Sequence, residues 1–317
     1  MFNKFRAYAA RSNTFSSLSA EALEKALAKK PFRPCGSQEM KSLGWSSWDD
    51  QSDSLVVTTR LNGKDDHFLL TLKIEERDLK SKVVNEALSK KIAEIEKNEG
   101  RKVGRKEKQQ LKEEVVQELM PRAMTSSSFV FAWIDAAKGR IIIDQTSDKK
   151  CESLLNLLRE CLGSLPVVPL RTMEDPIQAM TRWINNKAPK GFSLGESCTL
   201  VDAAISSNTV NIKGQDLACD EVVHHIEQGK CVKKLAMAGK DLSFTLDDRM
   251  IFSGIRVDES VLQELEESLG ESMDDKNAYF EGTFAIVVDA TQNLLDQMID
   301  HLGGIYDANA AGDEEEH

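Results

Sequence analysis

Apolar residues recur along the chain with two periods, one typical of helices and one typical of strands. A helical period predicts a helix over residues 81–98, whose apolar stripe consists of Val84, Leu88, Ile92 and Ile95. A second helix is predicted over residues 105–120, with a stripe formed by Leu111, Val115 and Leu119. Gly100 and Gly104 bracket the connection between them, and Pro121 ends the second helix. Because each stripe is narrow, we expect a helical hairpin that projects from the body of the protein as an arm.

Shorter runs outside the hairpin predict strands and further helices. Strands are expected at residues 2–11, 55–60, 67–74, 129–135, 140–144, 229–238, 242–246 and 250–256. Asn62-Gly63 lies between two of these runs and favours a tight hairpin turn. Helices are expected at residues 19–30, with Ser19 as N-cap, and at 148–162, 176–187, 261–269 and 292–302. This irregular alternation predicts an α+β fold with antiparallel sheets rather than repeated βαβ units.

The order of these elements suggests four parts. Residues 1–75 and 122–172 are expected to form a discontinuous central α+β domain, and residues 76–121 the helical arm or tip. Residues 173–305 form a second α+β domain, the base. The acidic tail, residues 306–317, is expected to be disordered.

The composition of the 317 residues, 41% hydrophobic and 29% charged, is that of a globular protein. It excludes a largely disordered chain and a disulfide scaffold. The longest clean apolar run, residues 129–134, is too short to cross a hydrocarbon core of ~30 Å, so no membrane association is expected. Six cysteines without a CxxC pair predict reduced thiols and a cytoplasmic location.

The net charge of −11 is unevenly distributed. Residues 241–317 hold 3 basic and 20 acidic residues, which leaves 38 basic and 32 acidic residues in the preceding 240. Residues 97–112 alone carry seven basic residues against two acidic ones. Because salt screens charges beyond ~8 Å, a polyanion responds to this local potential and not to the chain total. A nucleic-acid-binding surface is therefore compatible with the acidic composition, and a solvated helix face is the alternative.

Candidate catalytic chemistry is sparse. The sequence has no P-loop and no HExxH motif, and the adjacent His224 and His225 would point ~100° apart on a helix. We therefore expect no metal, no cofactor and no enzymatic activity. Cys35, in the turn Pro34-Cys35-Gly36-Ser37-Gln38, is the best candidate nucleophile, although a buried structural cysteine is the simpler interpretation.

Several stretches together resemble the RdgC family of bacterial recombination-associated proteins. They are Pro34–Gln38 with Leu43-Gly44-Trp45, Pro121-Arg122-Ala123, Trp133-Ile134-Asp135, the nine residues 162–170 (LGSLPVVPL), Gln215-Asp216-Leu217, and His225-Ile226-Glu227 with Gly229-Lys230. The resemblance implies a homodimeric ring that encircles duplex DNA without sequence specificity and restrains RecA-promoted recombination. It also implies a dimer contact at Met124, where the family often has an aromatic residue. Lys213-Gly214 stands where the family can have two lysines.

We therefore predict a nucleoid-associated, cytoplasmic, non-enzymatic protein whose partners are double-stranded DNA, with single-stranded DNA as a further candidate, and a second copy of itself. Its action on RecA is expected to be a functional antagonism. The predicted DNA-binding residues are Arg101, Lys102, Arg105, Lys106, Lys108, Lys112, Arg122, Lys213, Gln215, Lys233 and Lys234. The alternatives are a thiol-dependent enzyme that uses Cys35, and an adaptor that binds an acidic protein partner through the basic arm.

Overall fold

The computed structural model describes residues 2–11, 14–15, 18–61, 65–203, 207–258, 260, 263, 267 and 276–306. The chain divides into two compact units. The first unit comprises Met1–Leu23, Val56–Leu69 and Phe131–His317, and the second comprises Glu24–Leu55 and Leu70–Val130. Each unit is described by itself below.

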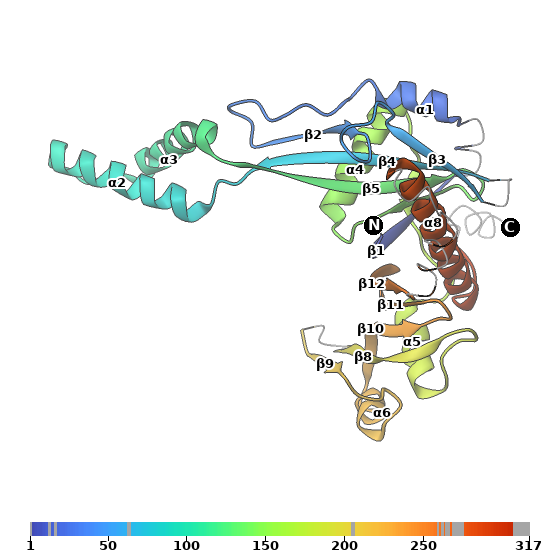
Figure 1. Cartoon of the computed structure of the whole chain (residues 1–317). Coiled ribbons are helices and arrows are strands. Elements are labelled where there is room, and N and C mark those ends of the chain that lie inside the picture. Colours follow the sequence, from blue (N-terminus) through green and yellow to red (C-terminus); the bar gives the residue numbers. More distant parts are fainter. Residues whose placement is uncertain are drawn as a thin grey trace, which may run out of the picture. The chain divides into compact units, whose positions relative to one another are not determined.

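Helices and strands alternate irregularly along the described chain (Figure 1). The helices are α1 (Ala20–Leu27), α2 (Ser81–Glu99), α3 (Arg105–Leu119), the 3₁₀ turn η1 (Met120–Arg122), α4 (Asp148–Leu162), α5 (Pro176–Asn185), α6 (Asp220–Glu227) and α8 (Lys276–His301). The strands are β1 (Lys4–Ala10), β2 (Lys41–Ser46), β3 (Val56–Leu61), β4 (Asp65–Arg77), β5 (Thr125–Asp135), β6 (Arg140–Ile143), β7 (Val167–Pro169), β8 (Ser193–Asp202), β9 (Thr209–Lys213), β10 (Lys230–Ala238), β11 (Leu242–Asp247) and β12 (Ile251–Val257). The predicted α+β class is confirmed.

The first unit contains an antiparallel sheet whose strand order is β5-β6-β1-β12-β11-β10-β8-β9. Strand β1 lies between β6 and β12, with Ala7 opposite Ile142 on one side and Phe5 opposite Phe252 on the other. The strands predicted at residues 129–135 and 140–144 are confirmed and pair as a hairpin, in which Asp135 lies opposite Arg140 across a turn where Gly139 has φ 63°. Positive φ there is accessible to glycine at little cost.

Alternating residues of this sheet build the core of the first unit. The rings of Phe5 and Phe252 stack with centroids 4.5 Å apart, and α5 packs against β10. Met180 and Trp183 of α5 are buried in the same cluster. Helix α5 begins where the sequence predicts, because Asp175 accepts a hydrogen bond from the Ile177 amide at 2.8 Å.

Helix α8 is longer than predicted, beginning at Lys276 and not at residue 292. Its first half contains Gly282 and adjacent valines, which lower helix propensity. Burial of Phe284 and Val288 in the core compensates for that weakness. Near the other end, Asp296 accepts hydrogen bonds from Lys138 and Arg140, each at 2.5 Å. Burial alone would raise the pKa of Asp296, but these two bonds outweigh it and hold the pKa below its ordinary value.

The second unit is built on strands β2, β4 and β5. Strand β2 is antiparallel to β4, with Lys41 opposite Glu76 and Ser46 opposite Thr71. The chain at Phe32 runs along the other edge of β2, since the Phe32 amide donates to the Trp45 carbonyl at 2.8 Å. Gly44 permits this approach, because a Cβ there would lie 2.6 Å from the Pro31 carbonyl oxygen and collide with the Phe32 backbone.

The helices α2 and α3 of the second unit confirm the two helices predicted around Gly100, within a residue at each end. Their projection as an arm stays a prediction. The predicted turn at residues 62–63, most of the predicted helix 261–269 and the tail from residue 307 lie outside the described residues. No helix in the described ranges is both long and apolar enough to span a membrane.

Candidate nucleic-acid interface

Helices α2 and α3 pack along the stripes that the sequence predicts. Val84 and Leu88 of α2 and Leu111 and Val115 of α3 are buried. Beside this seam, the Lys91 ammonium lies 3.1 Å from Glu114 and 2.8 Å from Glu118. Lys91 thus links α2 to α3, and this link fixes the position of the basic residues in the connection between the two helices.

The connection between α2 and α3 is closed by Gly100 and Glu96. Gly100 adopts the left-handed conformation, φ 65°, and its amide donates to the Glu96 carbonyl at 3.0 Å. The Glu96 carboxylate accepts from the Val103 amide at 3.1 Å. Arg101 therefore turns back, and its guanidinium contacts Glu107 at 2.6 Å and Glu99 at 2.7 Å. These carboxylates raise the pKa of Arg101, and Arg101 in turn lowers that of Glu107.

Five basic residues on α3 and in the turn before it differ from Arg101 because their charges are uncompensated among the described residues. All are exposed, and within the described part of the chain none makes an ion pair. They are Lys102, Arg105, Lys106, Lys108 and Lys112. Five solvated cations along one helix and its preceding turn form a surface that can neutralise phosphates without reading bases. We call these five residues the basic tip.

Arg122 and Met124 lie just after α3 and are both exposed, the Met124 side chain by 82%. The backbone that carries them is held by Arg77, the last residue of β4, and by Asp78, which follows it. The Asp78 amide donates to the Met124 carbonyl at 2.8 Å, and Arg77 Nη1 donates to the Ala123 carbonyl at 3.0 Å. Met124 is therefore an exposed side chain on a fixed backbone.

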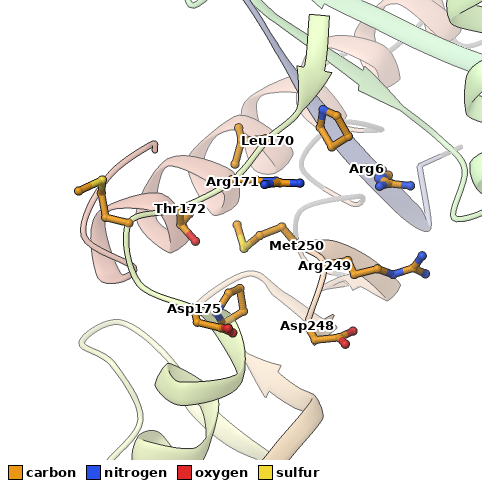
Figure 2. Close-up of a pocket in the computed structure, with 11 residues that line it drawn as sticks. Arg6, Leu170, Arg171, Thr172, Asp175, Asp248, Arg249 and Met250 are labelled. Carbon is orange, nitrogen blue, oxygen red and sulfur yellow. The ribbon is translucent and has the colours of Figure 1, made fainter. Parts of the chain in front are cut away.

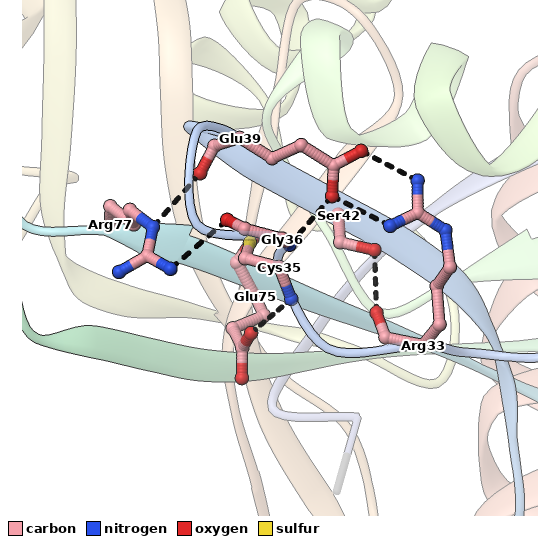
Figure 3. Close-up of polar contacts among 7 residues, drawn as sticks. All are labelled: Arg33, Cys35, Gly36, Glu39, Ser42, Glu75 and Arg77. Carbon is pink, nitrogen blue, oxygen red and sulfur yellow. Dashed lines mark hydrogen bonds and ion pairs between the residues drawn. The ribbon is translucent and has the colours of Figure 1, made fainter. Parts of the chain in front are cut away.

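Arg77 also binds the turn that contains Cys35 (Figure 3). Its Nη2 donates to the Gly36 carbonyl at 3.0 Å and its Nε to the Glu39 carbonyl at 3.1 Å. Within the turn, Arg33 contacts the Glu39 carboxylate through two hydrogen bonds of 2.6 Å, which lower the pKa of Glu39 to about 2. The Arg77 guanidinium thus joins the turn at Gly36 and Glu39 to the segment at Ala123, which is far away in the sequence.

Cys35 lacks the features of an activated nucleophile. Its amide donates to the Glu75 carboxylate at 2.6 Å, and its thiol donates to the Glu75 carbonyl at 3.3 Å (Figure 3). Burial and the neighbouring Glu75 raise the pKa of the Cys35 thiol. Because the thiolate is the nucleophile, these contacts oppose the thiol-enzyme alternative.

In the first unit, Lys213 ends β9 and is exposed, but the chain turns directly after it. Gly214 has φ 70° and its amide donates to the Glu196 carbonyl at 2.7 Å. Because the chain turns here, Lys213 and Gln215 do not lie on the same side of one extended segment, although both were predicted to bind DNA. The Gln215 amide contacts the Cys219 sulfur at 3.5 Å, whereas Lys213 makes no ion pair with any described residue.

Lys233 and Lys234, neighbours on β10, have different surroundings. Lys233 lies 3.9 Å from Asp248, whose pKa is raised by burial and by the adjacent Asp247. Lys234 is exposed and pairs in register with Thr199, which pairs in turn with Asn211. Directly opposed residues of a sheet share a face, so Lys234 and these two polar side chains form one row, which continues on β11 with Asp247 opposite Lys234.

Sequence reasoning missed Thr199 and Asn211. The signal that could have predicted β8 is the alternation of buried and less buried positions over residues 193–202, in which Cys198 and Leu200 are buried. No described residues form a group of three or more His, Cys, Asp or Glu side chains that could hold a metal ion.

An α+β architecture in which a helix pair carries the exposed cations of the basic tip places the chain in the class of candidate polyanion-binding proteins. The comparisons with known proteins are more specific, because the family model described as "Putative exonuclease, RdgC" matches residues 1–305. Curated relatives named Recombination-associated protein RdgC include that of Pseudomonas putida (strain GB-1), 37% identical over 90% of this chain and 92% of its own. Those of Pseudomonas paraeruginosa (strain PA7) and Enterobacter sp. (strain 638) are each 38% identical, covering 90% and 91% of this chain and 92% and 93% of theirs. The chain therefore belongs to the RdgC family.

Proposed function

We propose that this protein binds DNA without sequence specificity and acts in recombination. The observation that carries the proposal is the basic tip, whose five cations are solvated. Lys91 and Arg101, by contrast, form ion pairs with carboxylates of the same helices and their connection. Cations that are not paired within the protein remain available for phosphates, and releasing the counterions of DNA supplies binding free energy. The name of the relatives supports the recombination role.

The row formed by Lys234, Thr199 and Asn211, together with Lys213, supplies a second set of phosphate-binding groups in the first unit. Hydroxyl and amide side chains commonly contact phosphate oxygens beside lysines. None of these groups requires a particular base, which agrees with binding that is independent of sequence. Arg122, Gln215 and Lys233 complete the proposed set.

The ring is the finer part of the proposal. Two copies would close around duplex DNA, with Met124 at one contact between them, and bound rings would restrain RecA-promoted strand exchange. The 82% exposure of Met124 supports this role, since an apolar side chain on a fixed backbone is suited to burial by a partner. A location in the cytoplasm with the nucleoid follows from the same proposal.

Retention on circular DNA tests the ring. A closed ring leaves a covalently closed circle slowly and a linear duplex quickly, because only the linear duplex offers an end. We expect Met124→Glu to speed release from closed circles about tenfold while the protein stays dimeric through its second contact. Met40→Glu, which places the same charge on another exposed methionine of the second unit, is the matched control. Equal release of the wild type from circles and linear duplexes would reject the ring.

The same assay, with RecA inhibition measured beside it, separates two further candidate functions. Release of nucleotides from the linear duplex would favour a nuclease, in line with the description of the family model. An adaptor that binds RecA through the basic tip would lose RecA inhibition, but not DNA retention, when the tip charges are reversed.

A further inference from the structure

A cavity of about 420 Å³ lies in the first unit, and its lining includes no residue of the basic tip or of the Lys234 row. It is lined by β1, by the segment between β7 and α5, and by the turn between β11 and β12. Three arginines, Arg6, Arg171 and Arg249, contribute to its wall (Figure 2). The volume is within the range of pockets that hold small ligands.

The arginines come from three separate segments. Together they carry more positive charge than their ion-pair partner neutralises. Arg6 and Arg249 share one carboxylate, that of Asp148, with the Arg249 contact at 3.1 Å. Arg171 is exposed and makes no ion pair within the described ranges. Nε of Arg6 is buried and has no acceptor among the described residues. Because two of the three guanidinium groups share one carboxylate and the third has none among the described residues, this end of the cavity is suited to an anionic ligand.

The opposite end of the cavity carries carboxylates. Figure 2 shows Asp175 and Asp248 on the side away from Arg6 and Arg171. Asp175 is held by the Ile177 amide, and Asp248 lies 3.9 Å from Lys233. Carboxylates accept hydrogen bonds from amino and hydroxyl groups. The cavity therefore offers the donors of Arg6 and Arg171 at one end and the acceptors of Asp175 and Asp248 at the other, with Arg249 between Arg6 and Asp248.

The turn that presents Arg249 is tightly constrained. Met250 has φ 57°, a conformation that is costly for a residue other than glycine. The Asp247 carboxylate holds this turn by accepting from the amides of Arg249 and Ile251, each at 2.9 Å. Strained backbone that the surrounding contacts enforce is often found at ligand-binding sites.

We propose that this cavity binds a nucleotide, with its phosphate at the arginine end and the amino or hydroxyl groups of its base and sugar at the carboxylate end. The nucleotide is either free or the phosphorylated end of a DNA strand. This site goes beyond the proposed binding of duplex DNA, because none of its arginines belongs to the basic tip or to the Lys234 row.

Calorimetric titration of the full chain tests the proposal, with dAMP as the free nucleotide and inorganic phosphate as the comparison. Hairpin DNA with a 5′ phosphate, a 3′ phosphate or neither tests the strand end. The test variant is Arg171→Ala, and Arg11→Ala is the matched control, since Arg11 is also an exposed arginine of the first unit but does not line the cavity. Arg249→Ala provides a second test.

We expect the wild type and Arg11→Ala to bind dAMP or phosphorylated ends, and Arg171→Ala and Arg249→Ala to bind them at least about tenfold more weakly. Tighter binding of dAMP assigns the site to free nucleotides, and binding of phosphorylated hairpins alone assigns it to strand ends. The proposal is overturned if neither ligand binds, if inorganic phosphate binds as well as the nucleotide, or if Arg171→Ala has no effect. Closed circular DNA, which has no ends, reports on the proposed function separately.

Discussion

Neutralising part of the basic tip should change how DNA binding depends on salt. The perturbation is the triple variant Lys102→Gln, Arg105→Gln and Lys106→Gln, which removes three solvated charges and no ion pair among the described residues. Each phosphate contact contributes about −0.9 to the slope of log K against log salt concentration. If each of the three charges contacts a phosphate, the slope becomes shallower by about 2.7.

That slope difference is large enough to measure. Between 50 and 200 mM salt, the wild type should lose affinity roughly 40-fold more than the variant does. Fluorescence anisotropy with one duplex over a series of salt concentrations gives both slopes. The substituted side chains are exposed, so the unfolding midpoint in urea should stay the same.

Arg101→Gln is the informative control, because its guanidinium already contacts Glu99 and Glu107. We expect this single change to alter the slope by less than one third of the triple effect. An unchanged slope in the triple variant would refute the role of the basic tip. If Arg101→Gln alone changes the slope by one third of the triple effect or more, the argument that internal ion pairs decide which cations reach the DNA is refuted.

Three further predictions concern individual residues. Cys35 should react with iodoacetamide at pH 7 more slowly than a free thiol, because its raised pKa leaves less thiolate; faster alkylation would revive the enzyme alternative. Gly44→Ala should lower the free energy of unfolding by about 3 kcal/mol, as measured in urea, because the backbone of Phe32 must move; Gly104→Ala, with open space around its Cβ, should change it by less than 1 kcal/mol. Asp296→Asn should destabilise by about 1–3 kcal/mol at pH 7. Since the folded pKa of Asp296 is lowered, that difference should shrink as the pH falls below about 4, and a constant difference would contradict the ion-pair argument.

Local patterns predicted the parts of the fold in which propensity and packing agree. The stripe at Val84 and Leu88 located α2, and the helix predicted at residues 176–187 begins where α5 begins. The first half of α8 was missed because its glycine and valines are poor helix formers, and only the burial of Phe284 and Val288 in a distant core offsets that.

For the candidate site, the sequence identified where positive charge is concentrated but not which charges are free. Counting residues treats Arg101 and Lys102 alike. The left-handed turn at Gly100 places only Arg101 against two carboxylates, which no spacing rule predicts. The row that joins Lys234 to Thr199 and Asn211 was likewise hidden, because it depends on strand register.

The contacts of Arg77 have a consequence for how this protein can diverge. Its guanidinium holds the segments at Gly36, Glu39 and Ala123 through carbonyl oxygens, an atom that every amino acid possesses. Side chains around this anchor can therefore be exchanged over evolutionary time without displacing the main chain that bears them. Arg77 itself cannot be exchanged in this way, because the single ammonium group of a lysine cannot reproduce the three diverging N–H donors of the guanidinium.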